Sequence, residues 1–240
     1  MLGGGFDGLA ADPIPRQLKA ALATRENTSE GLRRRVPPGS PIVIAKPRDG
    51  RWRSIAPKRK IGVGDRTENE IRDIVVRRYV NNAWSDAVNL GNENWFIEGC
   101  PVNGPVIAAR GSDVVAAWFT AADNNARLRF ARSSDAGVGF GAVIDVDTRG
   151  TLGQPGIVLD DDGRAVLSWW RRGVQGGIDL MVQSFDRAGA AGPKQLIAHE
   201  AIGQAIDVPQ IIAAGHGYLI AWTTLDGAGN VRLAGPDLDL

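Results

Sequence analysis

Three stretches of the chain repeat one pattern of apolar and polar positions. In each, a short apolar segment is followed by a polar turn and by a second apolar segment that ends in tryptophan. The stretches are GPVIAARGSDVVAAWFT from Gly104, QPGIVLDDDGRAVLSWWR from Gln154 and VPQIIAAGHGYLIAWTT from Val208. Their turns are rich in Gly, Asp and Ser, which adopt the backbone angles of tight hairpins at low cost. Each stretch is therefore predicted to form a β-hairpin.

The three hairpins recur with a period of about fifty residues, which indicates stacked supersecondary units. Their common anchors are Pro105, Pro155 and Pro209 at the start and Trp118, Trp169 and Trp222 at the end. After each tryptophan a polar loop leads to a third strand, and the first two units continue to a fourth strand. Four strands per unit are typical of a propeller blade. The predicted fold class is therefore all-β, a β-propeller of four-stranded blades.

Blades are predicted at about 104–150, 154–198 and 208–240, with a partial blade at 70–90. The last unit stops early, and the segment PIVIAKPRDGRWRS from Pro41 is a candidate for part of a further blade. The propeller domain is thus expected to span 41–240. If the chain supplies no more blades, the propeller is incomplete, and its exposed sheet edges would favour self-association.

The periodic tryptophans have two interpretations. They are wedges between neighbouring blades, or they are platforms on which sugar rings stack. Their strict place at the end of the second strand favours the wedge.

Charge divides the chain into two unlike parts. Residues 1 to 60 hold 13 basic and 5 acidic residues, net +8, whereas residues 61 to 240 hold 15 and 22, net −7. The basic residues lack the interleaved aromatic side chains and the motifs of a nucleic-acid-binding segment. Residues 1–40 are therefore expected to be a basic, irregular leader, and no nucleic acid is expected as a partner.

Other classes of protein are disfavoured by composition. No apolar run is long enough to span a bilayer, and the first residues do not show the order of a secretory signal. The single cysteine, Cys100, excludes a disulfide within the chain. Asp160, Asp161 and Asp162 lack the further spaced oxygen ligands of a calcium site, so they are expected to form a turn. No metal and no cofactor is expected.

One turn in the first complete unit carries a recognisable motif. Residues 133 to 140 read SSDAGVGF, with the order Ser, x, Asp, x, Gly, x, x, aromatic. Ser and Asp side chains bond turn amides, glycine relaxes the backbone, and the aromatic ring packs between strands. Ser133, Asp135, Gly137 and Phe140 therefore resemble the Asp-box of sialidases (neuraminidases) and related BNR-repeat propellers. Asp-boxes in that family are structural, so the motif implies a fold rather than a reaction.

The resemblance implies where a site would lie. Ligands of sialidase-like propellers bind on the rim opposite the Asp-box turns, which is formed by the loops between strands two and three and by the crossovers between blades. The crossovers here are GNENWFIEGCPVNG from Gly91, DTRGTLGQ from Asp147 and HEAIGQAIDV from His199. Their polar residues, and those of the loops after each tryptophan, are the candidates.

Sialidases hold the substrate carboxylate with three arginines, attack with a tyrosine and protonate the leaving group with an aspartate. On the rim loops, the arginines matching the first role are Arg149, Arg171 and Arg172. The candidate acids and bases are Glu98, Asp123 and Asp207. Tyr79 and Tyr218 are both expected away from this rim, so hydrolysis by that machinery is not indicated.

The crossover from Gly91 has the densest set of polar and aromatic residues. Glu93, Asn94, Trp95 and Asn103 would combine an apolar platform with directed polar groups, as sugar sites do. Alternatively, Trp95 and Phe96 pin this crossover to the core.

The sequence thus predicts a sialidase-like, glycan-directed propeller that is a truncated or inactive relative of an exo-acting glycoside hydrolase. A non-catalytic propeller that binds protein or glycan through its rim is the alternative. Glycans or glycoproteins are the expected partners, and the resemblance favours an exported protein.

Overall fold

The structure is a computed structural model that describes residues 44–45, 53–54, 61–63, 69, 71–80, 83–98, 103–201, 208–224 and 230–236. These residues form antiparallel β-sheets, with one short 3-10 helix at Ala122–Asn124 between two strands. This confirms the predicted fold class. The predicted leader at 1–40, Cys100 and Asp207 lie outside the described residues.

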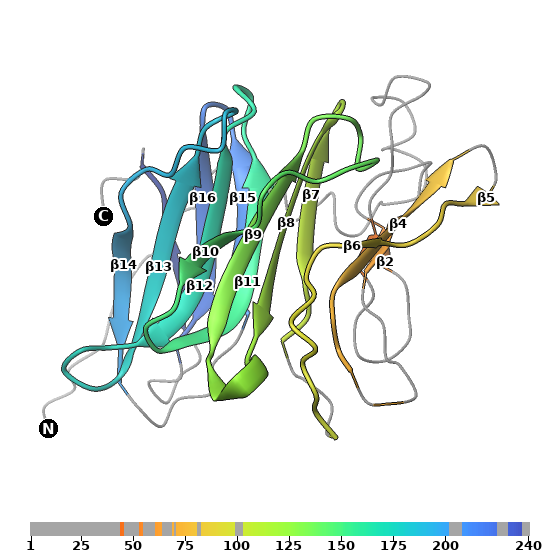
Figure 1. Cartoon of the computed structure of the whole chain (residues 1–240). Coiled ribbons are helices and arrows are strands. Elements are labelled where there is room, and N and C mark those ends of the chain that lie inside the picture. The colour runs from red at the N-terminus through yellow and green to blue at the C-terminus, as the bar shows by residue number, and fades with distance from the viewer. Residues whose placement is uncertain are drawn as a thin grey trace, which may run out of the picture. The chain divides into compact units, whose positions relative to one another are not determined.

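Two blades are complete four-stranded sheets (Figure 1). The second blade has the strand order β7-β8-β9-β10, with β7 Val106–Arg110, β8 Asp113–Thr120, β9 Arg127–Ser133 and β10 Ile144–Asp147. The third blade has the order β11-β12-β13-β14, with β11 Thr151–Leu159, β12 Ala165–Arg172, β13 Ile178–Phe185 and β14 Gln195–Glu200. Each tryptophan hairpin thus forms the first two strands of its blade.

The flanking sheets are smaller. The first blade contains β3 Ile61–Val63, β4 Val75–Val80, β5 Ala83–Trp84 and β6 Val88–Asn89, with β5 and β6 both paired to β4. The fourth blade contains β15 Gln210–Ala214, β16 Gly217–Thr223 and β17 Val231–Ala234. In the segment from Pro41, β1 Ile44–Ala45 and β2 Arg53–Ser54 form a two-stranded antiparallel pair.

The core consists of apolar clusters between successive blades. Between the second and third blades, the rings of Phe130 and Phe185 stack with centroids 4.3 Å apart. Trp118 lies in the cluster between the first and second blades, Trp169 in the next one, and Trp222 in the cluster between the third and fourth blades. At most 5% of each of these tryptophans is exposed. They are therefore wedges between blades, as the repeat predicts.

Alternation along β12 explains its tandem tryptophans. Successive side chains of a strand point to opposite faces, so Trp169 packs toward the second blade and Trp170 toward the fourth. The third blade is thus covered on both faces, which accounts for the nearly continuous burial of β12 and β13. No helix among the described residues is long and apolar enough to cross a membrane.

Candidate functional site

Strand connectivity places two different sets of loops at the two ends of the blades. The β7–β8, β9–β10, β11–β12 and β13–β14 turns lie at one end, here called the turn rim. The β8–β9 and β12–β13 loops and the crossovers into β7 and β11 lie at the other end, the crossover rim. Since the chain reverses at every strand, the predicted site residues and the Ser133–Phe140 turn belong to opposite ends.

The repeated tryptophans meet carboxylates at the crossover rim. The indole Nε1 donates a hydrogen bond to an acid of the preceding blade in three cases, which are Trp118 to Glu93 at 3.0 Å, Trp169 to Asp147 at 2.8 Å and Trp222 to Glu200 at 3.0 Å. Of these acids, Glu93 was predicted to bind a ligand. Only 3% of its side chain is exposed, and its Oε1 also accepts from Arg129. Its carboxylate is engaged in joining the blades.

The neighbouring crossover residues are fixed by one aspartate. The backbone N–H groups of Asn94 and Trp95 donate to the two oxygens of Asp73, at 3.1 and 3.2 Å. Trp95 is buried and meets Phe119 edge to face, while Phe96 is 58% exposed. The side chain of Asn94 is exposed on a backbone with a φ of 52°. The side chain of Trp95 therefore pins the crossover to the core, whereas Phe96 contributes only a backbone bridge to Ile71.

Asn103 spans the gap between two blades. Its Nδ2 donates to the carbonyl of Leu152 at 3.1 Å, and its Oδ1 accepts from the N–H of Gln154 at 2.7 Å. Both ends of the amide are thus bonded to the backbone of β11.

The three candidate arginines belong to one corner of the third blade. Arg171 pairs in register with Thr151, and the N–H of Arg172 donates to the carbonyl of Gly150 at 2.8 Å. Arg149 directly precedes Gly150, and its own N–H donates to Asp147. The side chains of Arg149 and Arg172 are exposed. The structure therefore brings these predicted residues together at two adjacent strand ends.

An aspartate and a histidine that the sequence did not single out complete this corner. Arg171, Asp179 and His199 stand directly opposite one another on β12, β13 and β14. Nδ1 of His199 lies 2.8 Å from Oδ1 of Asp179, and Nε of Arg171 lies 3.6 Å from Oδ2. The available signal was that His199, one of two histidines in the chain, opens a predicted crossover.

Two arginines at the crossover rim have buried nitrogens without hydrogen-bond partners. Nε of Arg171 is one of them, because 3.6 Å to Asp179 is too long for a hydrogen bond. Nε of Arg127, at the start of β9, is the other. Buried donors of this kind are usually satisfied, so they mark places where a polar ligand or water is expected.

The remaining candidates stand apart. Glu98 is exposed, and Asp123 is exposed on a left-handed backbone with a φ of 55° in the β8–β9 loop. Among the described side chains, no group of three or more His, Cys, Asp or Glu is suited to hold a metal ion.

On the turn rim, the Ser133–Phe140 turn is closed by its own side chains. Oδ1 of Asp135 accepts from Ser133 Oγ at 2.7 Å and from the N–H groups of Val138 and Gly139, each at 3.0 Å. Ser133 Oγ accepts from the N–H of Gly137 at 2.9 Å. The hydrogen bonds from Gly139 and Ser133 hold the pKa of Asp135 below its usual value.

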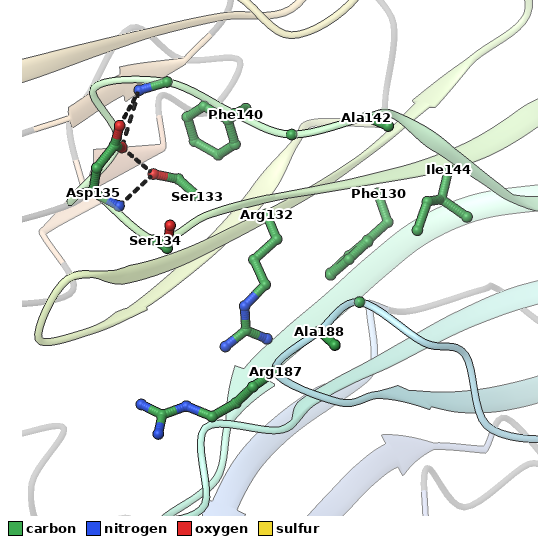
Figure 2. A pocket seen from close by; sticks show the side chains of 13 residues that line it. Phe130, Arg132, Ser133, Ser134, Asp135, Phe140, Ala142, Ile144, Arg187 and Ala188 are labelled. Carbon is green, nitrogen blue, oxygen red and sulfur yellow. Dashed lines mark hydrogen bonds between the residues drawn. The ribbon is translucent and has the colours of Figure 1, made fainter.

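A cleft of about 530 Å³ lies beside this turn (Figure 2). Phe130, Phe140 and Ile144 line one side, and Arg132 and Arg187 extend along the other. Both arginines bind Asp113, at 3.2 and 2.9 Å. Burial alone would raise the pKa of Asp113, but the hydrogen bonds from Arg187 and Arg132 outweigh burial and lower it. The arginines are thus engaged in joining the second and third blades.

Comparison with known proteins gives similarity of structure without similarity of sequence. No protein-family model matches the chain, and no curated protein matches its sequence. Among solved structures, a Hadza microbial sialidase is 14% identical with a TM-score of 0.45, and the match covers 81% of this chain and 43% of that one. Trypanosoma rangeli sialidase in complex with the inhibitor DANA is 10% identical with a TM-score of 0.41, covering 83% and 40%.

A thermostable family-43 glycoside hydrolase is 15% identical with a TM-score of 0.43, and the match covers 75% of this chain and 70% of that one. The chain spans less than half the length of the two sialidases. What these proteins bind or cleave does not by itself assign an activity to this chain.

Proposed function

We propose that the chain is a sialidase-like, glycan-directed β-propeller protein that binds acidic sugars at its crossover rim. The observation that carries the proposal is the corner of the third blade. There Arg171 and His199 both contact the carboxylate of Asp179, and Arg149 and Arg172 lie at the adjoining strand ends, with Arg172 on the opposite face of β12 from Arg171. Arginines present planar forks of donors that match a carboxylate. Three arginines at adjoining strand ends favour an anionic ligand at this corner.

The Ser133–Phe140 turn supports the sialidase-like part of the proposal. Its hydrogen bonds are those expected of an Asp-box, since Ser133 and Asp135 both bond turn amides. Phe140 packs against the apolar cluster between the first and second blades. We therefore assign this turn as an Asp-box of the BNR-repeat kind, with a structural role.

The tyrosines favour binding over sialidase-type hydrolysis. The chain has two, Tyr79 and Tyr218. Tyr79 lies near the end of β4 and packs edge to face on Trp84, and Tyr218 follows the β15–β16 turn. Both belong to the turn rim end of their strands. A tyrosine nucleophile is therefore not placed beside Arg171.

The proposal is tested by measuring binding of sialylated, uronate-containing and neutral glycans on an array and in solution. Acidic glycans are expected to bind, and Arg172→Ala should weaken binding about tenfold or more, since one charge-assisted hydrogen bond contributes about 1.5–3 kcal/mol. Lys194→Ala is the matched control, because it removes one exposed charge from the same blade at the turn rim. The proposal would be refuted if the protein bound none of the acidic glycans on the array. It would also be refuted if Arg172→Ala and Lys194→Ala weakened binding equally.

A second assay separates binding from hydrolysis. A fluorogenic sialoside is expected to remain intact in the presence of the protein. Turnover that Arg171→Ala abolishes would instead establish a sialidase and replace the binding function.

A further inference from the structure

The pair of Asp179 and His199 has the geometry of an oriented proton acceptor. Asp179 is 7% exposed and stands between two partners in register, so its carboxylate has little freedom. A carboxylate only accepts hydrogen bonds, so Nδ1 of His199 carries the proton in their 2.8 Å contact. When the imidazole is in its neutral form, its lone pair is then on Nε2. Because 51% of the histidine side chain is exposed, substrate can reach it.

Glycines in the β12–β13 loop hold the backbone close to this imidazole. A Cβ atom at Gly177 would lie 2.9 Å from Nε2 of His199, and one at Gly173 would lie 3.1 Å from Cε1. Any larger residue at these positions would press on the ring edge that bears Nε2. The loop backbone therefore packs against this side of the ring and helps to fix the orientation of His199.

We propose that His199 is the catalytic base of the crossover rim and that its substrate is a uronate-containing glycan cleaved by β-elimination. The inference rests on the proposed function, since it specifies which acidic glycan the rim accepts and what becomes of it. Arg171 and His199 contact Asp179 from the two neighbouring strands, so a cation and a base flank the same carboxylate. In a uronate, the carboxylate and an acidic C–H are likewise on one carbon.

The reaction needs only the groups present. Arg171 offsets the negative charge of the uronate carboxylate, which makes the proton on the adjacent carbon more acidic. Nε2 of His199 takes that proton, the electron pair forms a carbon–carbon double bond, and the bond to the neighbouring glycosidic oxygen breaks. The leaving oxygen takes a proton from water or from the imidazolium. The elimination requires no nucleophile, oxidant or metal. It is therefore compatible with a crossover rim at which neither Tyr79 nor Tyr218 lies.

The experiment uses the full chain with polygalacturonate and polyglucuronate as probes. The unsaturated uronate product absorbs in the ultraviolet, and the wild type is expected to produce it. His199→Gln should reduce the rate at least about a hundredfold, as expected for loss of a general base. Asp179→Asn should also reduce the rate, because it releases the imidazole from its fixed orientation.

His216→Gln is the matched control. His216 is the other histidine of the chain, it pairs with Asp162 at 2.9 Å, and it lies on the turn rim, so this variant should keep the wild-type rate. Circular dichroism checks that each variant is folded.

Binding of the same polymers is measured separately. Binding without unsaturated product, or new reducing ends without ultraviolet absorbance, overturns the elimination and leaves the glycan-binding function standing. Absence of binding to every acidic glycan refutes both proposals. Equal rates for the His199 and His216 variants also overturn the assignment of the base.

Discussion

The indole Nε1 of Trp118 donates a hydrogen bond to Oε1 of Glu93 across the boundary between two blades, at 3.0 Å. The same relationship recurs at Trp169 and Trp222, so an inter-blade bond is part of the repeat itself. Each bond satisfies the one polar atom of a buried tryptophan. The tryptophan thereby serves as an apolar wedge and as a donor that fixes its neighbour.

The acid and the residue opposite the tryptophan change together. Trp118 and Trp222 stand opposite Arg129 and Arg232, and both arginines contact the glutamate that the tryptophan binds. Trp169 stands opposite Met181 instead, and its acceptor is the shorter Asp147. An arginine on the third strand thus accompanies a glutamate, whereas the aspartate takes its second hydrogen bond from the backbone N–H of Arg149.

Replacing Glu93 with alanine should lower the free energy of unfolding by about 1–3 kcal/mol. The variant leaves the buried N–H of Trp118 without an acceptor, and an unsatisfied buried polar group costs about 1–3 kcal/mol. Arg129 keeps its ion pair with Asp145 at 2.8 Å in this variant. The lost stability therefore comes chiefly from the tryptophan N–H that has no acceptor. Urea denaturation measures the difference. Glu98→Ala is the control because Glu98 is exposed, and equal effects of the two variants would contradict the structural role of Glu93.

Alanine at Gly177 should be more destabilising than alanine at Gly176. Both glycines have a positive φ, of 67° and 91°, so both variants incur the cost of about 1 kcal/mol for a left-handed backbone. A Cβ at Gly177 would also lie 2.5 Å from the carbonyl oxygen of Glu200, whereas nothing lies within 4 Å at Gly176. Denaturation midpoints compare them. A smaller loss for Gly177→Ala would show that the loop does not pack against His199.

The Asp135→Asn variant should be less stable than the wild type at neutral pH, with a difference that shrinks in acid. Hydrogen bonds from Gly139 and Ser133 lower the pKa of Asp135 in the folded state. Its stabilisation is therefore present above the unfolded pKa of about 3.8 and is lost as the pH falls through the folded pKa. Thermal unfolding from pH 7 to pH 2 measures this. A stability difference that stays constant from pH 7 to pH 2 would contradict the role of the Asp135 carboxylate.

Asp162→Asn should lower the pKa of His216. The hydrogen bond from the imidazole to Asp162, and the charge of that carboxylate, raise the pKa of His216 above 6.5 in the folded protein. The stabilisation is complete below pH 6.5 and is lost as the pH rises through the folded pKa. NMR titration of the imidazole follows the shift. A pKa that is unchanged in the variant would show that the pair does not form in solution.

The local pattern of the sequence determined the blades. The apolar segments, the turn residues and the anchors Pro105, Pro155 and Pro209 lie within single hairpins, where short-range geometry and the need to bury apolar faces fix the outcome. The burial of the tryptophans and the self-bonded turn at Ser133 and Asp135 follow from the same local patterns. Arg149, Arg171 and Arg172 could be assigned to one rim because the chain reverses direction at every turn, which places the loops that carry them at the same end of the blade.

Only the tertiary structure decided which polar groups meet. Glu93 bonds a tryptophan 25 residues away and Asn103 a backbone carbonyl 49 residues away, in both cases across a blade boundary. Asp179 and His199 meet because the register of β13 and β14 places them opposite each other, and a bulge between Leu180 and Met181 shifts that register. Periodicity predicts the spacing of strands, but it does not predict a bulge. Contacts between blades and between strands depend on the register of the strands and on such bulges. Only the folded chain therefore determined that the carboxylate of Glu93 joins two blades, whereas that of Asp179 orients His199 at the crossover rim.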